Sequence, residues 1–192
     1  MAKLYFSYST MNAGKSTVLL QASHNYRERG MRTLLYTSSF DDRKEKGLIH
    51  SRIGISQEAN LFKEGDDLYS VLVKEHESET VACVFIDEAQ FLSEEQVWQL
   101  ARFGDDFKVP VMCFGLRTDF QGKLFEGSKA LLAIADTLRE IRTICWCGSK
   151  ANMVVRIDGD GNIIDEGAQV MIGGEEKYVS LCRKHWCAKA LG

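Results

Sequence analysis

The sequence predicts an α/β protein in which helices cover both faces of a parallel β-sheet, followed by a small metal-binding module. Up to about residue 141, strand-like and helix-like segments alternate, a pattern typical of parallel sheets whose strands are joined by helices. The first predicted strand leads directly into a phosphate-binding sequence. Cysteine pairs near the C-terminus predict the metal-binding module.

Residues 9–17 read Ser-Thr-Met-Asn-Ala-Gly-Lys-Ser-Thr and predict a nucleotide site. In the pattern G-x-x-x-x-G-K-[ST], backbone N–H groups surround the phosphates, the lysine neutralises them and the hydroxyl binds Mg²⁺. Gly14, Lys15 and Ser16 match this pattern, whereas Ser9 replaces its first glycine. The loop must therefore open in a conformation that a residue with a Cβ atom can adopt. A helix that merely begins with Gly-Lys-Ser is the alternative interpretation.

The segments around this loop favour the nucleotide site. Residues 3–8 are rich in strand formers, and residues 16–29 repeat apolar side chains at helical spacing. Residues 33–38 predict a second buried strand. Residues 40–51 are charged and contain a glycine, and they predict a loop.

Further strands and helices follow in alternation. Residues 80–86 are almost continuously apolar, as expected of a strand buried on both faces, and residues 110–116 predict another buried strand. A helix should start at Ser93, because Ser93 and Gln96 form a capping box in which each side chain binds the other residue's backbone N–H group. Another helix is predicted over residues 66–76, and an apolar helix or strand edge over residues 131–138.

The strand at residues 80–86 ends in an acidic pair, Asp87 and Glu88. Parallel sheets bind their ligands at the carboxyl ends of the strands. In phosphate-loop proteins an aspartate at this position supports Mg²⁺ together with the loop hydroxyl, here Ser16. Glu88 is then available to orient and deprotonate an attacking hydroxyl group. A solvated pair that caps the next helix is the alternative interpretation.

The composition changes near Arg142, and we expect two units at this chain length. They are a nucleotide-binding core over residues 1–141 and a small module over residues 142–192. Within the module, residues 153–157 and 163–164 flank a turn-rich Asp-Gly-Asp-Gly-Asn segment. This arrangement predicts a β-hairpin.

Two close ligand pairs in the module, Cys145 with Cys147 and Cys182 with His185, predict a structural Zn²⁺ site. Three thiolates and one imidazole suit the closed tetrahedral coordination of structural zinc. Cys187 is an alternative fourth ligand, but His185 gives the two-residue gap of ordinary zinc knuckles. Reduced thiols without metal are the other alternative. A bound ion would tie the two ends of the intervening segment together.

Composition narrows the function classes. A net charge of −3 and a pI near 5.8 offer no basic footprint for a nucleic-acid polymer. No apolar run approaches the roughly 20 residues that span a bilayer, and the opening residues lack the features of a signal peptide. We therefore expect a cytoplasmic protein without a membrane partner. In this compartment disulfides are rare, so Cys83 and Cys113, within apolar strands, are expected to be core residues.

Together these features resemble the type II thymidine kinases, the small zinc-containing cellular kind, and particularly their bacterial branch. The resemblance covers essentially the full length and rests on five separated motifs in the family's order. In the family, a glycine stands at the position of Ser9 and a zinc thiolate at that of His185, and both replacements are seen in the bacterial branch. The motifs are residues 11–17 (M-N-A-G-K-S-T), 85–91 (F-I-D-E-A-Q-F), 115–121 (G-L-R-T-D-F-Q), 172–174 (I-G-G) with Tyr178, and 182–185 (C-R-K-H).

The resemblance implies a RecA-like phosphate-loop core with a zinc-bound lasso loop. It implies transfer of the γ-phosphoryl group of ATP to the 5′-hydroxyl of thymidine, and also of deoxyuridine, giving dTMP in nucleotide salvage for DNA synthesis. Glu88 would be the general base, and Asp87 and Ser16 would serve Mg²⁺. The implied ATP and Mg²⁺ contacts are Ser9, Thr10, Met11, Asn12, Ala13, Gly14, Lys15, Ser16, Asp87, Glu88, Ala89 and Gln90.

The resemblance also implies where thymidine binds. The base would lie in an apolar slot held largely by main-chain groups of the lasso, with Tyr178 near the sugar and Phe91 beside the base. Considered without the family, Phe120 and Phe125 are core residues more often than ligand walls. The implied contacts are Met11, Phe91, Leu116, Phe120, Phe125, Val170, Met171, Ile172, Gly173 and Tyr178.

Asp41 and Arg43 match family positions near the transferred phosphate, where Arg43 would stabilise developing charge. A solvated pair in a charged loop is the alternative interpretation. The resemblance further implies a homotetramer and feedback inhibition by dTTP.

Two other function classes compete with a kinase. A nucleic-acid motor would hydrolyse ATP with water as the nucleophile at Glu88, but the acidic pI and the short core disfavour it. A nucleotide sensor is the second alternative. It would have no need for a base, so the acidic pair of Asp87 and Glu88 argues against it.

Overall fold

The computed structural model describes residues 3–40, 47–169 and 177–192. Six strands form one sheet in the order β5-β2-β6-β7-β1-β8, and every neighbouring pair is parallel. The alternation of strands and helices therefore predicted the sheet correctly. The strands are β1 (Leu4–Ser9), β2 (Thr33–Ser38), β5 (Asn60–Phe62), β6 (Cys83–Ile86), β7 (Val111–Leu116) and β8 (Thr137–Glu140).

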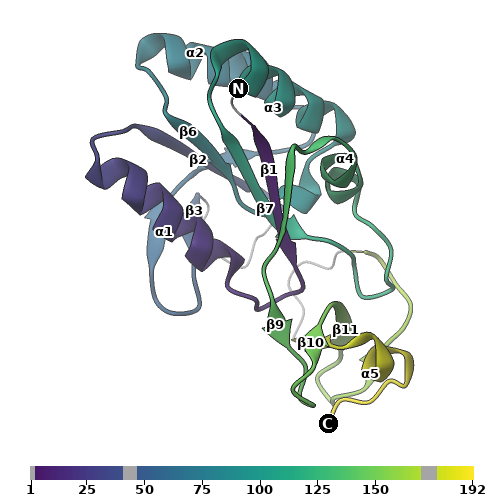
Figure 1. Cartoon of the computed structure of the whole chain (residues 1–192). Coiled ribbons are helices and arrows are strands. Elements are labelled where there is room, and N and C mark those ends of the chain that lie inside the picture. The colour runs from purple at the N-terminus through teal and green to yellow at the C-terminus, as the bar shows by residue number, and fades with distance from the viewer. Residues whose placement is uncertain (1–2, 41–46, 170–176) are drawn as a thin grey trace.

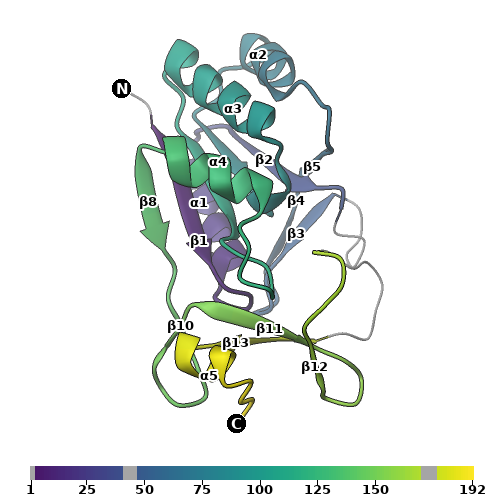
Figure 2. The same cartoon turned by 90° about the vertical axis from the view of Figure 1, so that its right-hand side faces the viewer.

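Helices cover both faces of this sheet (Figures 1 and 2). One face packs on α1 (Lys15–Glu28), and the other packs on α2 (Leu68–Ser78), α3 (Glu94–Phe107) and α4 (Glu126–Ile134). Among the described residues, no helix is long and apolar enough to cross a membrane. The sheet thus separates two hydrophobic clusters, one beneath each layer of helices.

Strand β6 shows why a continuous apolar run was expected there. Its four residues are fully buried, and successive side chains enter opposite clusters, as the two-residue period of a strand requires. Cys83 and Phe85 pack toward α1, while Val84 and Ile86 pack toward α2, α3 and α4. Cys113 in β7 is also fully buried, so the two strand cysteines are core residues as predicted.

The capping box at the start of α3 is present. The Ser93 hydroxyl accepts a hydrogen bond from the Gln96 N–H at 3.2 Å, and Gln96 Oε1 accepts one from the Ser93 N–H at 3.1 Å. The buried Gln96 amide also donates to the carbonyl of Lys63 at 2.8 Å. This helix end therefore anchors the chain before α2 as well.

Two segments form other elements than the sequence predicted. Residues 48–50, expected to be loop, form β3 (Leu48–His50), which pairs antiparallel with β4 (Ser56–Glu58) around a turn where Gly54 has φ 89°. Strands of three residues are too short to show a period in sequence. The apolar run at 131–138 was expected to be a helix or a strand edge. It contains the end of a helix, α4, and the start of a strand, β8.

The C-terminal module lies at the carboxyl ends of the sheet strands (Figures 1 and 2). The predicted hairpin is present, with Ile157 opposite Ile163, and a later strand pairs with its other edge. The division into residues 1–141 and 142–192 stays a prediction. The module's elements are β9 (Thr143–Ile144), β10 (Lys150–Ala151), β11 (Met153–Ile157), β12 (Ile163–Ile164), β13 (Lys177–Leu181) and α5 (Arg183–Cys187).

Helix α4 packs closely on the short turn η1 (Ala89–Phe91) that follows β6. A Cβ atom added to Gly127 would lie 2.5 Å from the Ala89 carbonyl oxygen and 2.7 Å from that of Leu92. Real Cβ atoms essentially never approach backbone oxygens this closely. Only glycine therefore lets the helix lie so near the turn.

Gly127→Ala should destabilise the protein by about 1–2 kcal/mol in urea unfolding, because overpacking outweighs the gain in helix propensity of up to about 1 kcal/mol. Lys129→Ala, at an exposed position of the same helix, is the matched control and should change stability little. An unfolding free energy equal to wild type in Gly127→Ala would contradict the packing argument.

Candidate active site

The phosphate-loop sequence joins β1 to α1 and opens as an extension of the strand. Ser9 is the last residue of β1, pairs with Leu116 in β7, and does not adopt a positive φ. The left-handed positions are instead Asn12, at φ 63°, and Gly14, at φ 83°. Asparagine tolerates this region better than most side chains. Serine can therefore replace the glycine at position 9, since the backbone there is extended and does not require glycine.

Lys15 is half-buried and folds back over the loop, where its ammonium group donates to the Thr10 carbonyl oxygen at 2.7 Å. Burial lowers the pKa of Lys15, and the nearby carboxylates of Glu88 and Asp87 act in the opposite direction. The ammonium group thus lies inside the loop with two acids close by. This is an arrangement suited to an anionic ligand that carries its own cation.

The Ser16 hydroxyl donates to Asp87 Oδ2 at 2.9 Å, so the loop and the end of β6 meet as the sequence predicted. Asp87 is 2% exposed, and burial, followed by the negative charge of Glu88, raises its pKa to about 7. The bond from Ser16 and the charge of Lys15 oppose that rise. A hydroxyl and a carboxylate held together at a phosphate loop are ligands suited to Mg²⁺.

Glu88 has a left-handed backbone, with φ 54°. Its carboxylate accepts a hydrogen bond from the Gln90 side-chain amide at 2.6 Å, and Gln90 Oε1 accepts one from the Leu116 N–H at 2.9 Å. Gln90 is 2% exposed and links Glu88 to β7. Strained backbone of this kind clusters at functional sites, and here a buried amide fixes the direction of the acid.

Gly115 makes room for this link. A Cβ atom there would lie 2.8 Å from Gln90 Oε1 and 2.9 Å from the Gln90 backbone nitrogen. Sequence reasoning assigned Gln90 to the nucleotide contacts and missed its role toward Glu88. The glycine in a buried strand was the available signal, since such a glycine often marks close backbone approach.

A cavity of about 410 Å³ lies in front of the loop. Four predicted ATP and Mg²⁺ contacts, Ser9, Thr10, Asp87 and Ala89, are buried and do not line it. The predicted Asp41, Arg43, Val170, Met171, Ile172 and Gly173 lie outside the described residues. The predicted site residues that line the cavity are Met11, Asn12, Ala13, Gly14, Lys15, Ser16, Glu88, Gln90, Phe91, Leu116, Phe120, Phe125 and Tyr178.

The cavity has one polar and one apolar side. The polar side is the loop with Lys15 and Glu88, and the apolar side contains aromatic rings. Phe91 and Phe125 meet edge to face with ring centres 6.0 Å apart. Phe120 lies under the Arg156 guanidinium, whose central carbon is 4.1 Å from the ring centre. Such a cavity suits a ligand with a flat apolar part and an end that reaches the phosphate site.

Sequence reasoning missed the hairpin of β3 and β4. Its residues His50, Ser51, Arg52 and Ile53 line the cavity, and the Ser51 and Thr17 hydroxyls form a hydrogen bond between the hairpin and α1. No motif marks these residues. His50 and Ser51 fall in the charged segment over residues 40–51 that predicts a loop, and Arg52 and Ile53 follow it directly. Thr118, Asp119, Val154 and Gln169 also line the cavity and were not predicted.

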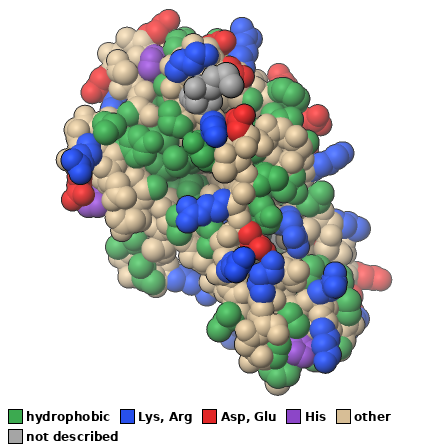
Figure 3. All heavy atoms as spheres, viewed as in Figure 1, with side chains coloured by type: hydrophobic (Ala, Val, Ile, Leu, Met, Phe, Trp, Pro, Cys, Tyr) green, Lys and Arg blue, Asp and Glu red, His purple; other side chains and the backbone are tan. Residues whose placement is uncertain are grey.

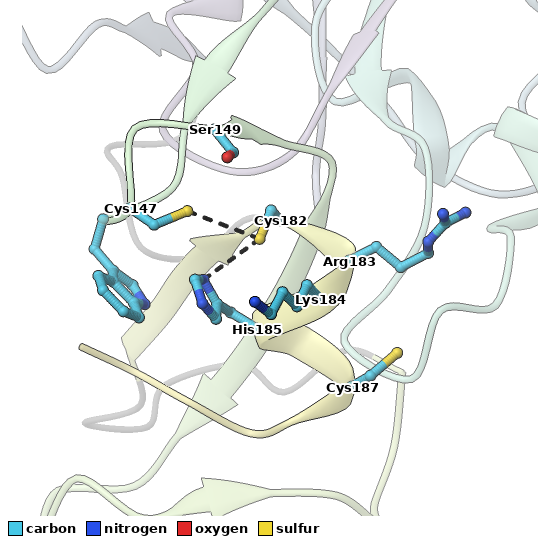
Figure 4. A pocket seen from close by; sticks show the side chains of 8 residues that line it. Cys147, Ser149, Cys182, Arg183, Lys184, His185 and Cys187 are labelled. Atoms are coloured by element: carbon cyan, nitrogen blue, oxygen red, sulfur yellow. Dashed lines mark hydrogen bonds between the residues drawn. The ribbon is translucent and has the colours of Figure 1, made fainter.

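The four predicted metal ligands come together in the module. Figure 4 shows three of them, Cys147, Cys182 and His185. One donor atom from each of Cys145, Cys147, Cys182 and His185 lies within 4.8 Å of all the others. His185 Nδ1 is 3.4 Å from the sulfur of Cys145 and 3.4 Å from that of Cys182. Cys187 does not belong to this group, and in Figure 4 its thiol points away from it.

The donor set fits a tetrahedral zinc ion. Ligand bonds of roughly 2.0–2.3 Å to a common centre place the donors less than about 4 Å apart, close to the spacing observed here. Burial alone would raise the pKa of the Cys145 thiol, but hydrogen bonds from the backbone N–H groups of Cys147 and Cys182 and from His185 lower it to about 6. Cys145 is thus poised as a thiolate, the form that binds metal.

Comparison with known proteins agrees with this geometry. The family model described as thymidine kinase matches residues 2–186. A thymidine kinase of Agrobacterium fabrum is 64% identical over 97% of this chain and 96% of its own length. One from Ruegeria pomeroyi is 66% identical over 97% and 94%, and one from Haemophilus influenzae is 58% identical over 98% of each chain.

Among solved structures, the replication initiator DnaA bound to AMPPCP and single-stranded DNA is 18% identical with a TM-score of 0.42, over 74% of this chain and 41% of that one. This likeness is too distant to bear on function. The family model, in contrast, spans almost the whole sequence. The bacterial relatives align with this chain over nearly their whole length. The chain therefore belongs to the thymidine kinase family, in its bacterial branch.

Proposed function

We propose that this chain transfers the γ-phosphoryl group of ATP to the 5′-hydroxyl of thymidine, giving dTMP for DNA synthesis by nucleotide salvage, with Glu88 as the general base. Membership of the thymidine kinase family makes it an ATP-dependent nucleoside kinase. The observation that carries the residue roles is the cavity in which the phosphate loop, Glu88 and an aromatic wall meet.

ATP binds with its phosphates on the loop of residues 9–16. The backbone N–H groups and the Lys15 ammonium neutralise the phosphate oxygens. Ser16 and Asp87, already 2.9 Å apart, bind the Mg²⁺ that accompanies the nucleotide. A cation held by these two residues would offset the desolvation of the buried Asp87, which raises the pKa of its carboxyl group to about 7. Ala89 and Gln90 complete the ATP side.

Glu88 accepts the proton of the 5′-hydroxyl as its oxygen attacks the γ-phosphorus. The amide of Gln90 keeps one carboxylate oxygen engaged at 2.6 Å, which leaves the other to face the substrate. Fixing the base in this way lowers the entropy cost of reaching the productive geometry. The bond from phosphorus to the β–γ bridging oxygen breaks, and ADP leaves with the negative charge.

Thymidine occupies the apolar side of the cavity. Its base lies among Met11, Phe91, Leu116, Phe120 and Phe125, and Tyr178 contacts the sugar. Main-chain groups of residues 170–173 hold the edge of the base. A pocket of this kind accepts deoxyuridine too, because one missing methyl group changes binding by only about 1 kcal/mol.

The cluster of Cys145, Cys147, Cys182 and His185 holds a structural Zn²⁺ ion that links the two ends of the module. When bound, the ion supplies a cross-link and no chemistry, because all four positions are filled by protein. The proposal includes a core over residues 1–141 and a zinc module over residues 142–192. Asp41 and Arg43 assist near the transferred phosphate.

The remaining assignments concern partners. The protein acts in the cytoplasm as a homotetramer that dTTP inhibits by binding in the thymidine site. No nucleic-acid polymer is a substrate. On the face seen in Figure 3, the Lys and Arg side chains are scattered among acidic and apolar ones from one end of the molecule to the other. The net charge of −3 is in line with that distribution.

The activity is tested with radiolabelled ATP and each of the four deoxynucleosides, and separately with single-stranded DNA. Label should pass to thymidine and to no DNA-dependent product. Phosphate release stimulated by DNA, without label on any nucleoside, would instead identify a motor.

Glu88→Gln should lower kcat by about 10²–10⁴-fold, the effect of losing a general base, while ATP binding measured by titration persists. Glu77→Gln, the same substitution at an exposed position of α2, is the matched control and should leave kcat unchanged. Wild-type turnover in Glu88→Gln would remove Glu88 from the proton transfer.

The wild-type protein should contain about one zinc ion per chain by elemental analysis. Cys145→Ser should lose the ion and expose residues 142–192 to limited proteolysis, because binding and ordering of such modules are coupled. Cys187→Ser should retain the metal and is the matched control. A zinc-free wild type would refute the site, and loss of zinc in Cys187→Ser would make that residue a ligand.

A further inference from the structure

We infer that Ser180, a residue of β13 in the C-terminal module, is a positioning residue for the phosphate loop and thereby for ATP. The inference rests on the proposed function, since it concerns how the proposed ATP site is held. Ser180 does not line the cavity and is separated from the loop by about 170 residues of sequence. Its effect on ATP is therefore exerted through the loop.

The contact is direct. The half-buried Ser180 hydroxyl lies 2.8 Å from the Met11 carbonyl oxygen and 3.0 Å from Thr10 Oγ1. A hydroxyl group has one hydrogen and two acceptor positions, so Ser180 is shared between both neighbours. Thr10 and Met11 form the first turn of the loop, immediately after β1 ends at Ser9.

This turn needs support from outside the loop. Lys15 donates to the Thr10 carbonyl oxygen at 2.7 Å, but its ammonium must turn toward the phosphates when ATP binds. The carbonyl then loses that partner. The contacts from Ser180 reach the Thr10 hydroxyl and the next carbonyl, and they do not depend on Lys15. They can therefore hold the turn in the ATP-bound state as well.

The strand that carries Ser180 is itself well fixed. It forms a five-residue antiparallel ladder with β11, in which Ser180 is opposite Val154. Alternate residues of a strand share a face, and two residues before Ser180 on that face Tyr178 lines the cavity. Two residues after it, Cys182 belongs to the metal-binding cluster. One short segment thus connects the cluster, the phosphate loop and the wall of the cavity.

Ser180→Ala in the full-length protein tests this role. The KM for ATP and the Kd for Mg·ATP, measured by titration without nucleoside, should both rise about five- to tenfold, the loss expected for hydrogen bonds of this type. The kcat at saturating ATP should stay within about twofold of wild type. Ser78→Ala is the matched control, because Ser78 also donates to a backbone carbonyl, that of Glu75 at 2.9 Å, but on an exposed helix end.

Ser180→Thr keeps the hydroxyl and should restore the wild-type Kd for Mg·ATP. Thr10→Val removes the other hydroxyl of the pair and should also raise this Kd. Its effect should be less than additive with that of Ser180→Ala, since both variants lose the contact between Ser180 and Thr10. Additive effects, or a Ser180→Ala protein that binds ATP as wild type does, would overturn the inference. If the Ser180→Ala protein does not fold, the Kd of Thr10→Val for Mg·ATP tests the inference in its place. A wild-type Kd in Thr10→Val would then overturn the inference.

The two proposals fail in different ways. A wild-type protein without thymidine-dependent label transfer would refute the proposed kinase reaction, whereas the titration with Mg·ATP would still measure the effect of Ser180. An active wild type with an unaffected Ser180→Ala titration would refute the role of Ser180 alone. Zinc content measured in each variant shows whether the metal-binding cluster is intact. If ATP affinity falls only in the variants that lose zinc, and not with removal of the Ser180 hydroxyl, the role of Ser180 would also be refuted.

Discussion

The hydrogen bond between Ser16 and Asp87 is the contact on which the site depends. It joins the start of α1, which follows β1 and the phosphate loop, to the end of β6, although β7 lies between β1 and β6 in the sheet. The bond can form only if three neighbouring strands keep their parallel register. It also buries a carboxylate whose desolvation is costly. The apolar clusters on both faces stabilise the sheet that imposes this arrangement.

Much of the core could be predicted because its signals are local. The buried run of β6 requires burial on both faces, and the capping box of Ser93 and Gln96 is encoded within four residues. The β3–β4 hairpin could not be predicted in the same way, since its short strands are defined by pairing with each other and by contact with α1. Contacts between distant segments leave no period in a sequence.

The same distinction holds within the site. The metal-binding group was predictable because soft donors at close spacing are rare, and the structure brings those four together without Cys187. The hydrogen bond from Gln90 that orients Glu88 was not predictable, because it depends on the direction of the Gln90 amide and on the space left by Gly115. Motifs identify which chemical groups are present. Their orientation is decided by neighbours that the motifs do not contain.

The acidic turn after β6 is enclosed between two glycines, Gly115 in the next strand and Gly127 in α4. Since any Cβ atom at either position would meet backbone or amide atoms of that turn, both positions are closed to substitution while the turn keeps its shape. The tip of the β3–β4 hairpin is exposed at residues 52–55. Apart from Gly54, whose φ of 89° favours glycine, its residues face no such limit. Mutant libraries meant to alter substrate choice should accordingly vary residues 52, 53 and 55 of the hairpin tip and leave Gly54, Gly115 and Gly127 untouched.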